Sequence, residues 1–452
     1  MSTTFVRPRP GLFRALWRWH FYASFLVAPV LLILATTGLI YLFRFQVEPL
    51  MHADLMRVQP DPHSVGQPLA AQLKAVESAH PGATVLSVTE AGTNSQSTRF
   101  SVESAEGARD VFVNPYDATV LGSLNPDTTL SGYAVRLHGE LMAGRFGDLV
   151  IELGACWAVV MALTGYYLLI KGRPARRRMS ELRRTHARIG AVVGVGLLFL
   201  LVSGLPWTGV WGAKVQELAT AQGSSLWSTD PGAVSDPTSR LDESLPHSHH
   251  TEVPWAQGAT PVPKSSNTRT GSVANVDTAI AVADEQGLRH PMTVALPSDD
   301  SGTYSVIGYA FDAPTDEKTV HVDRYGGGVV STYGFDDYPA LAKAVSLGIG
   351  LHEGRSLGLW SFFGAAFMCV AVIASCVTGP LMWWRRRPSG SGVGAPRGRL
   401  PLRTTPLLLT ATILLGVFLP AFGVSLLLVL AADHLLVRRV PAFSAFFNVS
   451  RQ

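Results

Sequence analysis

Charged residues are scarce in this chain of 452 residues. Lys and Arg number 37, Asp and Glu number 33, and together they make up 15% of the sequence, against about 25% in an average soluble domain. Hydrophobic residues account for 47%, and the mean hydropathy is +0.23. This composition excludes a wholly disordered or collagen-like chain and indicates apolar segments combined with polar domains.

Cysteine is also scarce, and several familiar motifs are missing. The three cysteines, Cys156, Cys369 and Cys376, lie in apolar stretches, so they read as small buried hydrophobes rather than a disulfide framework. The sequence has no C-x-x-C-H haem-attachment motif, no phosphate-binding P-loop and no H-E-x-x-H zinc helix. We expect no nucleic-acid partner.

What the sequence has instead is long apolar runs. Four are long enough to cross a hydrocarbon core, which takes about 20 helical residues: 21–43, 149–170, 189–212 and 357–384. The first is too long for a signal-peptide core. A fifth apolar region, 402–437, is interrupted by Pro420 and Gly423 and is either one tilted helix or a hairpin of two short ones.

The charges between these runs predict their topology. Short basic segments flank them, and the positive-inside rule makes those segments cytoplasmic: 1–20, 171–188, 385–401 and 438–452. The longer segments 44–148 and 213–356 hold 30 of the 33 acidic residues, so we expect them on the outer side. Arg438 and Arg439 favour the hairpin and six crossings over five. We therefore predict a polytopic α-helical membrane protein.

Each outer segment reads as a small α+β domain. A helical pattern at 69–79 or 276–286 precedes short alternating strands, which are predicted at 98–102, 110–113, 303–309 and 319–322. The second segment also contains a Ser-, Thr-, Pro- and Gly-rich stretch, 220–272, which predicts a disordered insertion. We interpret its histidines His247, His249 and His250 as part of a solvated loop.

An internal duplication is the most informative feature of the sequence. In the first and third apolar helices a histidine precedes a glycine by 18 residues, and before the second and fourth a histidine precedes a glycine by 27. The pairs are His20 and Gly38, His186 and Gly204, His138 and Gly165, and His352 and Gly379. Each glycine follows Thr or Ser. The chain therefore reads as two copies of helix, outer domain and helix, plus an apolar tail.

The four histidines form two predicted pairs, with His20 and His186 on the inner side and His138 and His352 on the outer side. Facing imidazoles are suitable ligands for an iron macrocycle, and without C-x-x-C-H the haem is non-covalent, b-type. Twenty-seven helical residues span about 40 Å, more than the hydrocarbon core. We therefore expect His138 and His352 in juxtamembrane elements, with breaks at 144–148 and 354–358. Interfacial anchoring of the histidines and ordinary helix packing of the glycines remain open alternatives.

Several motifs resemble a known family. RWHFY near the start, RLHGEL and GLHEGRS before the second and fourth helices, and the recurring TG late in those helices resemble the PepSY-associated transmembrane family, also called iron-regulated membrane proteins. The resemblance implies PepSY outer domains and b haems like those of inner-membrane ferric-siderophore reductases. It implies His20, His138, His186 and His352 as haem-iron ligands, with His434 in the tail as a possible substitute within the inner pair.

The leading hypothesis is an electron conduit that holds two b haems in the bilayer and reduces a ferric siderophore or other ferric chelate outside. The electron donor is expected to be a cytoplasmic reductase or membrane quinol. The competing hypothesis is a non-enzymatic membrane protein whose PepSY-like domains bind or regulate a partner. A transporter is disfavoured, since Glu152 is the only carboxylate within the four clear spans and lies near an end.

Overall fold

The computed structural model describes residues 10–172, 180–212, 239–240, 253–254, 257, 260–265, 274–308, 313–387, 393 and 406–448. The chain divides into two compact units. We call them the helical unit, Met1–Leu39, Leu137–Val215 and Ala366–Gln452, and the sheet unit, Ile40–Arg136 and Gln216–Ala365. His247, His249, His250 and most of the predicted insertion 220–272 lie outside the described residues.

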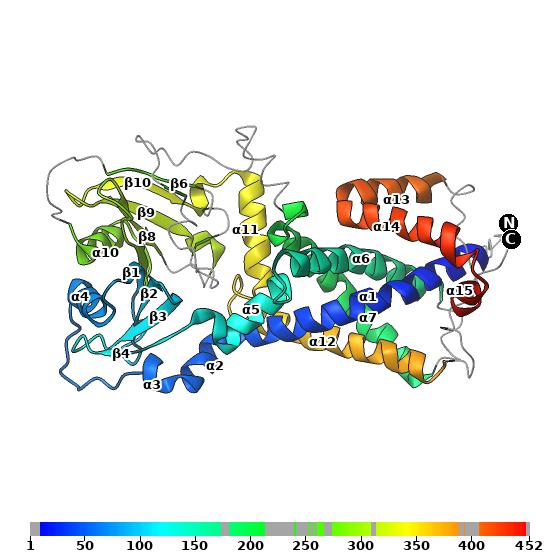
Figure 1. The fold of residues 1–452 in the computed structure, drawn as a ribbon, viewed down its shortest axis with the longest axis horizontal. Coiled ribbons are helices and arrows are strands. Elements are labelled where there is room, and N and C mark those ends of the chain that lie inside the picture. Colours follow the sequence, from blue (N-terminus) through cyan, green and yellow to red (C-terminus); the bar gives the residue numbers. More distant parts are fainter. Residues whose placement is uncertain are drawn as a thin grey trace, which may run out of the picture. The chain divides into compact units, whose positions relative to one another are not determined.

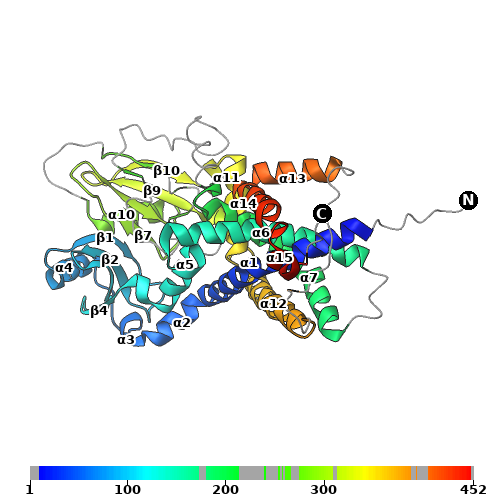
Figure 2. The same ribbon diagram turned by 45° about the vertical axis from the view of Figure 1, so that its right-hand side comes forward.

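Within the described residues, five helices are long and apolar enough to cross a membrane, as expected of a polytopic helical membrane protein. Four of them are α1 (Pro10–Leu42), α6 (Gly144–Lys171), α7 (Glu181–Gly204) and α12 (Leu359–Trp384). The fifth is α14 (Pro420–Ala432), which continues as a π-helical turn over Asp433–Val437. Figures 1 and 2 show these helices from two directions.

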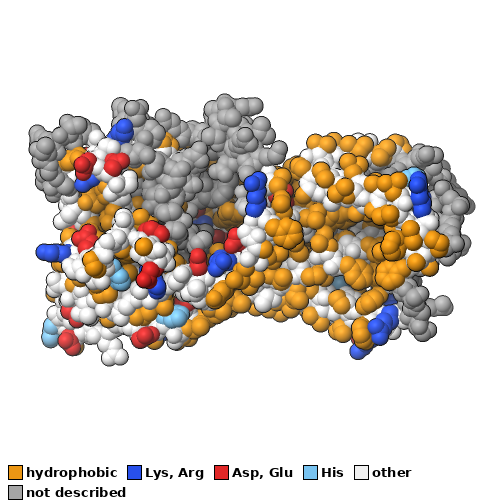
Figure 3. All heavy atoms as spheres, viewed as in Figure 1, with side chains coloured by type: hydrophobic (Ala, Val, Ile, Leu, Met, Phe, Trp, Pro, Cys, Tyr) orange, Lys and Arg blue, Asp and Glu red, His pale blue; other side chains and the backbone are white. Residues whose placement is uncertain are grey.

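The core of the helical unit is made by four helices. Val27 of α1, Ala158 of α6, Val193 of α7 and Val372 of α12 belong to one buried cluster. Many large side chains on the same helices are exposed, such as Phe367 on α12, and hydrophobic side chains cover this unit on the face drawn in Figure 3. Exposed apolar surface of this extent suits helices surrounded by lipid.

Two helix boundaries differ from the sequence prediction. Helix α1 begins at Pro10, so His20 lies inside the helix and not just before it. The break before α6 begins earlier than the predicted segment 144–148, because Leu141 and Met142 adopt positive φ angles of 50° and 55°, and it reaches the predicted segment at Gly144, whose φ is 56°. Non-glycine residues seldom adopt this left-handed conformation, so no local motif indicates a break at Leu141 and Met142. Before α12, Gly354 and Gly358 likewise have positive φ angles at the predicted position.

Carboxylates of α6 hold the segment that follows α7. Helix α7 ends at Gly204, earlier than the predicted 212, and a 3-10 helix follows at Leu205–Trp207. Glu152 is fully buried and accepts hydrogen bonds from the backbone N–H groups of Val210 (2.9 Å) and Trp211 (3.2 Å). This bonding gives Glu152 a structural role.

The C-terminal apolar region consists of two helices. Helix α13 (Pro406–Phe418) and α14 are separated at Leu419, immediately before Pro420. They pack closely because Gly423 meets the backbone of Gly416, where a Cβ atom would lie 2.5 Å from the carbonyl oxygen. With 13 residues, α13 is shorter than the about 20 residues that span a bilayer. A short helix, α15 (Pro441–Phe446), follows.

The sheet unit contains one antiparallel sheet in the order β10-β9-β8-β7-β1-β2-β3-β4. Its first four strands in the chain are β1 (Thr84–Thr89), β2 (Thr98–Ser104), β3 (Gly107–Val113) and β4 (Val120–Leu124). The later four are β7 (Thr293–Ala295), β8 (Thr303–Ile307), β9 (Lys318–Asp323) and β10 (Val329–Gly334). A separate two-stranded pair joins β5 (Ser239–Arg240) and β6 (Pro261–Val262).

The two predicted outer domains share this sheet. Strand β1 pairs with β7 through Ser87 and Ala295, Val88 and Val294, and Thr89 and Thr293. Each strand would otherwise be an exposed edge, and pairing the edges satisfies their backbone groups. The four strands from each segment therefore form one continuous layer instead of two separate domains.

Two helices cover one face of the sheet. Helix α4 (Leu69–Ala79) and α10 (Val276–Glu285) contribute Val76 and Ala279 to the same buried cluster as Phe100 and Val294 of the strands. Figure 1 shows both helices beside the sheet. Their positions agree with the predicted helices 69–79 and 276–286.

Short elements complete the chain. Helices α2 (Arg44–Met51) and α3 (Ala53–Met56) follow α1, while α5 (Leu130–Glu140) and α11 (Ala340–His352) precede α6 and α12. Short 3-10 helices cover Pro126–Thr128, Pro314–Asp316 and Phe335–Asp337. His138 and His352 therefore lie on helices separate from α6 and α12, as the 27-residue spacing predicts.

A buried histidine makes the sheet unit sensitive to acid. His321 of β9 is 1% exposed, its Nδ1 lies 2.9 Å from the Ser305 hydroxyl, and burial lowers its pKa to about 4. The unfolded chain binds the proton below about pH 6.5, so stability should fall as the pH drops from 6.5 to 4, by about 3 kcal/mol. Thermal unfolding of the full chain in detergent checks this: His321→Gln should lose less stability over that range, and parallel pH profiles would contradict it.

Candidate functional site

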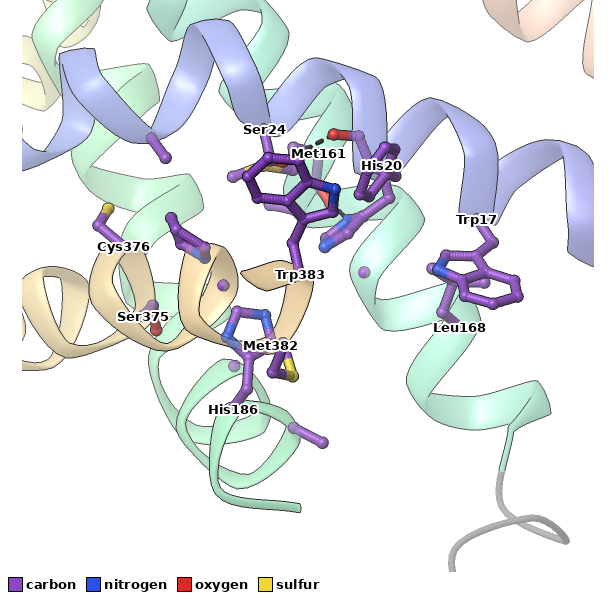
Figure 4. Close-up of a pocket in the computed structure, with 18 of the residues that line it drawn as sticks. Trp17, His20, Ser24, Met161, Leu168, His186, Ser375, Cys376, Met382 and Trp383 are labelled. Atoms are coloured by element: carbon purple, nitrogen blue, oxygen red, sulfur yellow. Dashed lines mark hydrogen bonds between the residues drawn. The ribbon is translucent and has the colours of Figure 1, made fainter. Parts of the chain in front are cut away.

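The helical unit contains a cavity of about 520 Å³ between α1, α6, α7 and α12. This volume lies within the range of about 300–1,000 Å³ typical of small-molecule and cofactor sites. Most of its lining is apolar and includes Phe21, Phe25 and Leu168. Figure 4 shows the cavity with its aromatic and histidine side chains. Its size and lining suit a flat apolar ligand.

His20 and His186 both line this cavity. His20 comes from α1 and His186 from α7, the two helices that carry the 18-residue repeat. In Figure 4 their imidazole rings point into the cavity from the two helices. The structure therefore brings together the histidines that the sequence assigns to the inner pair.

Hydrogen bonds at Nδ1 fix both rings. The His20 Nδ1 lies 2.9 Å from the carbonyl oxygen of Met161 and 3.3 Å from the hydroxyl oxygen of Thr164. The His186 Nδ1 lies 3.0 Å from the hydroxyl oxygen of Thr378. Both threonines belong to the TG pairs singled out in the sequence.

The glycine of each TG pair lies against the same imidazole. A Cβ atom at Gly165 would be 3.1 Å from Cε1 of His20, closer than an ordinary van der Waals contact, whereas one at Gly379 would be 4.0 Å from Cε1 of His186. Gly165 is therefore required for space, and Gly379 is not.

We expect Gly165→Ala to destabilise the helical unit and Gly379→Ala to be tolerated. Both changes carry the same gain in helix propensity, about 1 kcal/mol, but only Gly165→Ala adds a methyl group that presses on His20, a steric cost of roughly 1–3 kcal/mol. Thermal unfolding of the two variants side by side measures the difference. Equal shifts in both would show that the His20 contact imposes no constraint.

His138 repeats the arrangement at the other end of α1. It lies on α5, its Nδ1 is 3.0 Å from the hydroxyl of Thr37, and a Cβ at Gly38 would be 3.4 Å from its Cε1. Because α1 and α6 run antiparallel, His20 of α1 meets the TG pair of α6, and His138 of α5, just before α6, meets the TG pair of α1. The 18-residue spacing along α1 is thus the separation between its contact with α6 and its contact with α5.

The other two sequence-predicted histidines lie elsewhere. His352 is the last residue of α11, half-buried, in the sheet unit. His434 lies in the π-helical turn after α14 and is not among the residues that line the cavity.

Three arginines of the cavity lining were not predicted as site residues. Arg183, Arg386 and Arg387 line it, and no carboxylate does so among the described residues. The Arg386 Nη2 lies 3.2 Å from the hydroxyl of Ser180, and the Arg387 guanidinium stacks 3.8 Å from the Trp384 ring centroid. The sequence did indicate these arginines, because they belong to basic segments next to the spanning helices. We interpreted those segments as markers of topology alone. A ligand with negative charge suits this part of the cavity.

Comparison with known proteins gives one family. Residues 17–386 match the family described as the PepSY-associated TM region, which is more than half of the chain and includes α6, α7, α12 and most of α1. No curated protein matches the chain.

Proposed function

The chain belongs to the PepSY-associated TM region family, and on that premise we propose that it is a b-type haem protein of the bacterial inner membrane. It would carry electrons across the bilayer and reduce a ferric siderophore or other ferric chelate on the outer side, where iron is released as Fe²⁺. The observation that carries the proposal is that two imidazoles point into one apolar cavity among the spanning helices.

The residues of the cavity fit a haem. His20 and His186 would hold its iron, because imidazole is a good ligand for iron. Arg183, Arg386 and Arg387 supply the positive charge that haem carboxylates need, and the apolar lining suits the macrocycle. When bound, the haem supplies a reversible one-electron couple of its iron.

The protein would position the haem and determine its surroundings. The hydrogen bonds at Nδ1 hold both rings in place, and the apolar side chains exclude water from the cavity. An iron held by both histidines would suit electron transfer better than O₂ binding. Burial of the haem and hydrogen bonds to its histidine ligands would then set its reduction potential.

A second haem is assigned to His138 and His352 on sequence grounds. The contact of His138 with Thr37 and Gly38, which matches the contacts of His20 and His186 with their own TG pairs, supports a ligand role for His138. The electron donor is proposed to be a cytoplasmic reductase or membrane quinol.

We further infer that the chain arose by duplication and that its outer domains are PepSY-like. In support, α4 followed by β1 to β4 has the same element order as α10 followed by β7 to β10. The acidic segments lie outside and the basic ones inside under the positive-inside rule.

Reduction across a vesicle membrane tests the proposal. The purified haem-loaded chain is placed in liposomes that enclose an impermeant reductant, and a ferric siderophore with an Fe²⁺-specific chelator is added outside. We expect Fe²⁺ to form with the wild type and with His434→Gln, a matched control whose histidine does not line the cavity, but not with His186→Gln. A rate no higher than in protein-free vesicles would support a non-enzymatic role, and equal rates for the two variants would show that reduction does not depend on His186.

A further inference from the structure

Three of the candidate histidines share one hydrogen-bond arrangement. In each, Nδ1 lies within 3.3 Å of a threonine hydroxyl, and that threonine immediately precedes the glycine that lies against the ring. The pairs are His20 with Thr164, His138 with Thr37 and His186 with Thr378. Because the arrangement recurs at three histidines, we expect it to have the same chemical role at each.

Each threonine hydroxyl has a carbonyl acceptor on its own helix. A hydroxyl has one proton, and the carbonyl oxygen four residues earlier lies within hydrogen-bond distance of it. The distances are 2.9 Å from Thr164 to Val160, 2.8 Å from Thr378 to Ala374 and 2.8 Å from Thr37 to Ile33. A hydroxyl that donates to this carbonyl has only its lone pairs left for the imidazole, so it accepts a hydrogen bond from Nδ1, and Nδ1 then carries the proton.

A second contact of His20 independently indicates that its Nδ1 carries the proton. Its Nδ1 is 2.9 Å from the carbonyl oxygen of Met161, which has no proton to offer. Nδ1 of His20 is therefore the donor, and a neutral imidazole with a proton on Nδ1 has a lone pair on Nε2. Among the described residues, Nε2 of neither His20 nor His186 has a hydrogen-bond partner.

We propose that Thr164 and Thr378 are positioning residues that fix the Nδ1-protonated tautomer of His20 and His186, so that both present an unprotonated Nε2 to the cavity. Thr37 has the same role for His138. The proposal rests on the proposed haem function and adds to it by explaining why a threonine recurs beside these histidines, since its hydroxyl sets the tautomer.

The two inner histidines differ in how much they depend on threonine. A hydrogen bond donated from Nδ1 makes the imidazole a stronger electron donor to a metal on Nε2, which stabilises the oxidised metal. His186 has Thr378 alone as its Nδ1 acceptor among the described residues, whereas His20 retains the Met161 carbonyl if Thr164 is lost. Loss of Thr378 should therefore have the larger effect.

The tautomer can be measured without haem. The full chain is produced in haem-deficient cells with ¹⁵N-labelled histidine, and the His186 signals are assigned by their absence in His186→Gln. We expect a protonated Nδ1 and an unprotonated Nε2 in the wild type and in Thr378→Ser. A protonated Nε2 in the wild type would overturn the proposal whatever the chain binds.

The haem-loaded protein gives the second measurement. Thr378→Val should raise the midpoint potential of one haem and weaken haem retention about 10- to 100-fold, Thr164→Val should do so less, and Thr378→Ser should restore wild-type values. Equal effects of Thr378→Val and Thr378→Ser would mean that packing, not the hydroxyl, matters and would overturn the proposal. A wild-type protein that binds no haem would contradict the proposed function, while the ¹⁵N result would still decide the tautomer.

Discussion

Replacing His186 or His20 with alanine is expected to remove the haem of the inner cavity and leave any second haem in place. Both imidazoles reach the same cavity, and each alanine would delete one axial ligand and leave a void beside the other. The haem-to-protein ratio should fall by about one haem per chain. Pyridine haemochrome analysis of the purified variants measures the ratio, and low-spin electron paramagnetic resonance signals identify which site is lost.

His434→Gln is the matched control for these variants. His434 is also a histidine of the helical unit, but it lies after α14 and does not line the cavity. The His434→Gln variant should therefore retain the full haem content. If both cavity variants kept wild-type haem and spectrum, His20 and His186 would not be the ligands, and the inner site would have to be sought elsewhere.

Replacing Arg355 with methionine should produce the largest loss of stability in the sheet unit. Arg355 is bonded to Glu317 (3.3 Å) and Glu353 (2.6 Å), and the three side chains are 11%, 2% and 9% exposed. Removing the cation leaves two buried carboxylates without their partner, which typically costs about 3–5 kcal/mol. Arg355 lies between α11, which ends in His352, and α12, so this network also anchors the segment after a candidate ligand.

The loss of stability caused by Arg355→Met should become smaller as the pH is lowered. Burial already raises the pKa of Glu317, while Arg355 holds it down. Without Arg355 the pKa should rise further, so the folded variant would take up a proton at a higher pH than the unfolded chain. Protonation then relieves the buried charge, and the loss of stability should shrink as the pH is lowered from 7.5 towards 5.

An exposed arginine provides the comparison. Arg289 is paired with Asp316 but its side chain is 55% exposed, so Arg289→Met should cost less than about 1 kcal/mol. Thermal unfolding of the full chain in detergent compares the two variants at each pH. If Arg355→Met cost no more than Arg289→Met, the buried network would not hold this part of the sheet unit together.

Local patterns in the sequence predicted much of the fold. Helix periodicity placed α4 at 69–79 and α10 close to its observed bounds, and the break before Pro420 follows from the missing N–H of proline. The pairing of β1 with β7 was not predicted, because strands some 200 residues apart meet without any local signal. The left-handed turn at Leu141 and Met142 likewise depends on tertiary structure.

For the candidate site, spacing singled out two histidines that line the cavity but did not predict their contacts. The 18- and 27-residue repeats singled out His20, His186 and the TG pairs, yet they left open whether the glycines face helices, a macrocycle or, as the structure has it, the imidazoles. Arg183 and Arg386 were interpreted as topology signals, because a basic loop next to a membrane helix has that role by default. Their place in the cavity lining depends on how α7 and α12 pack.

The most direct test of the account is the reduced-minus-oxidised absorption spectrum, with the haem-to-protein ratio, of the wild-type chain purified from haem-sufficient cells. Bis-histidine b haem in the membrane predicts a Soret band, a sharp α band on reduction and a ratio of about two. A purified chain without a Soret band would contradict the claim that it is a haem protein.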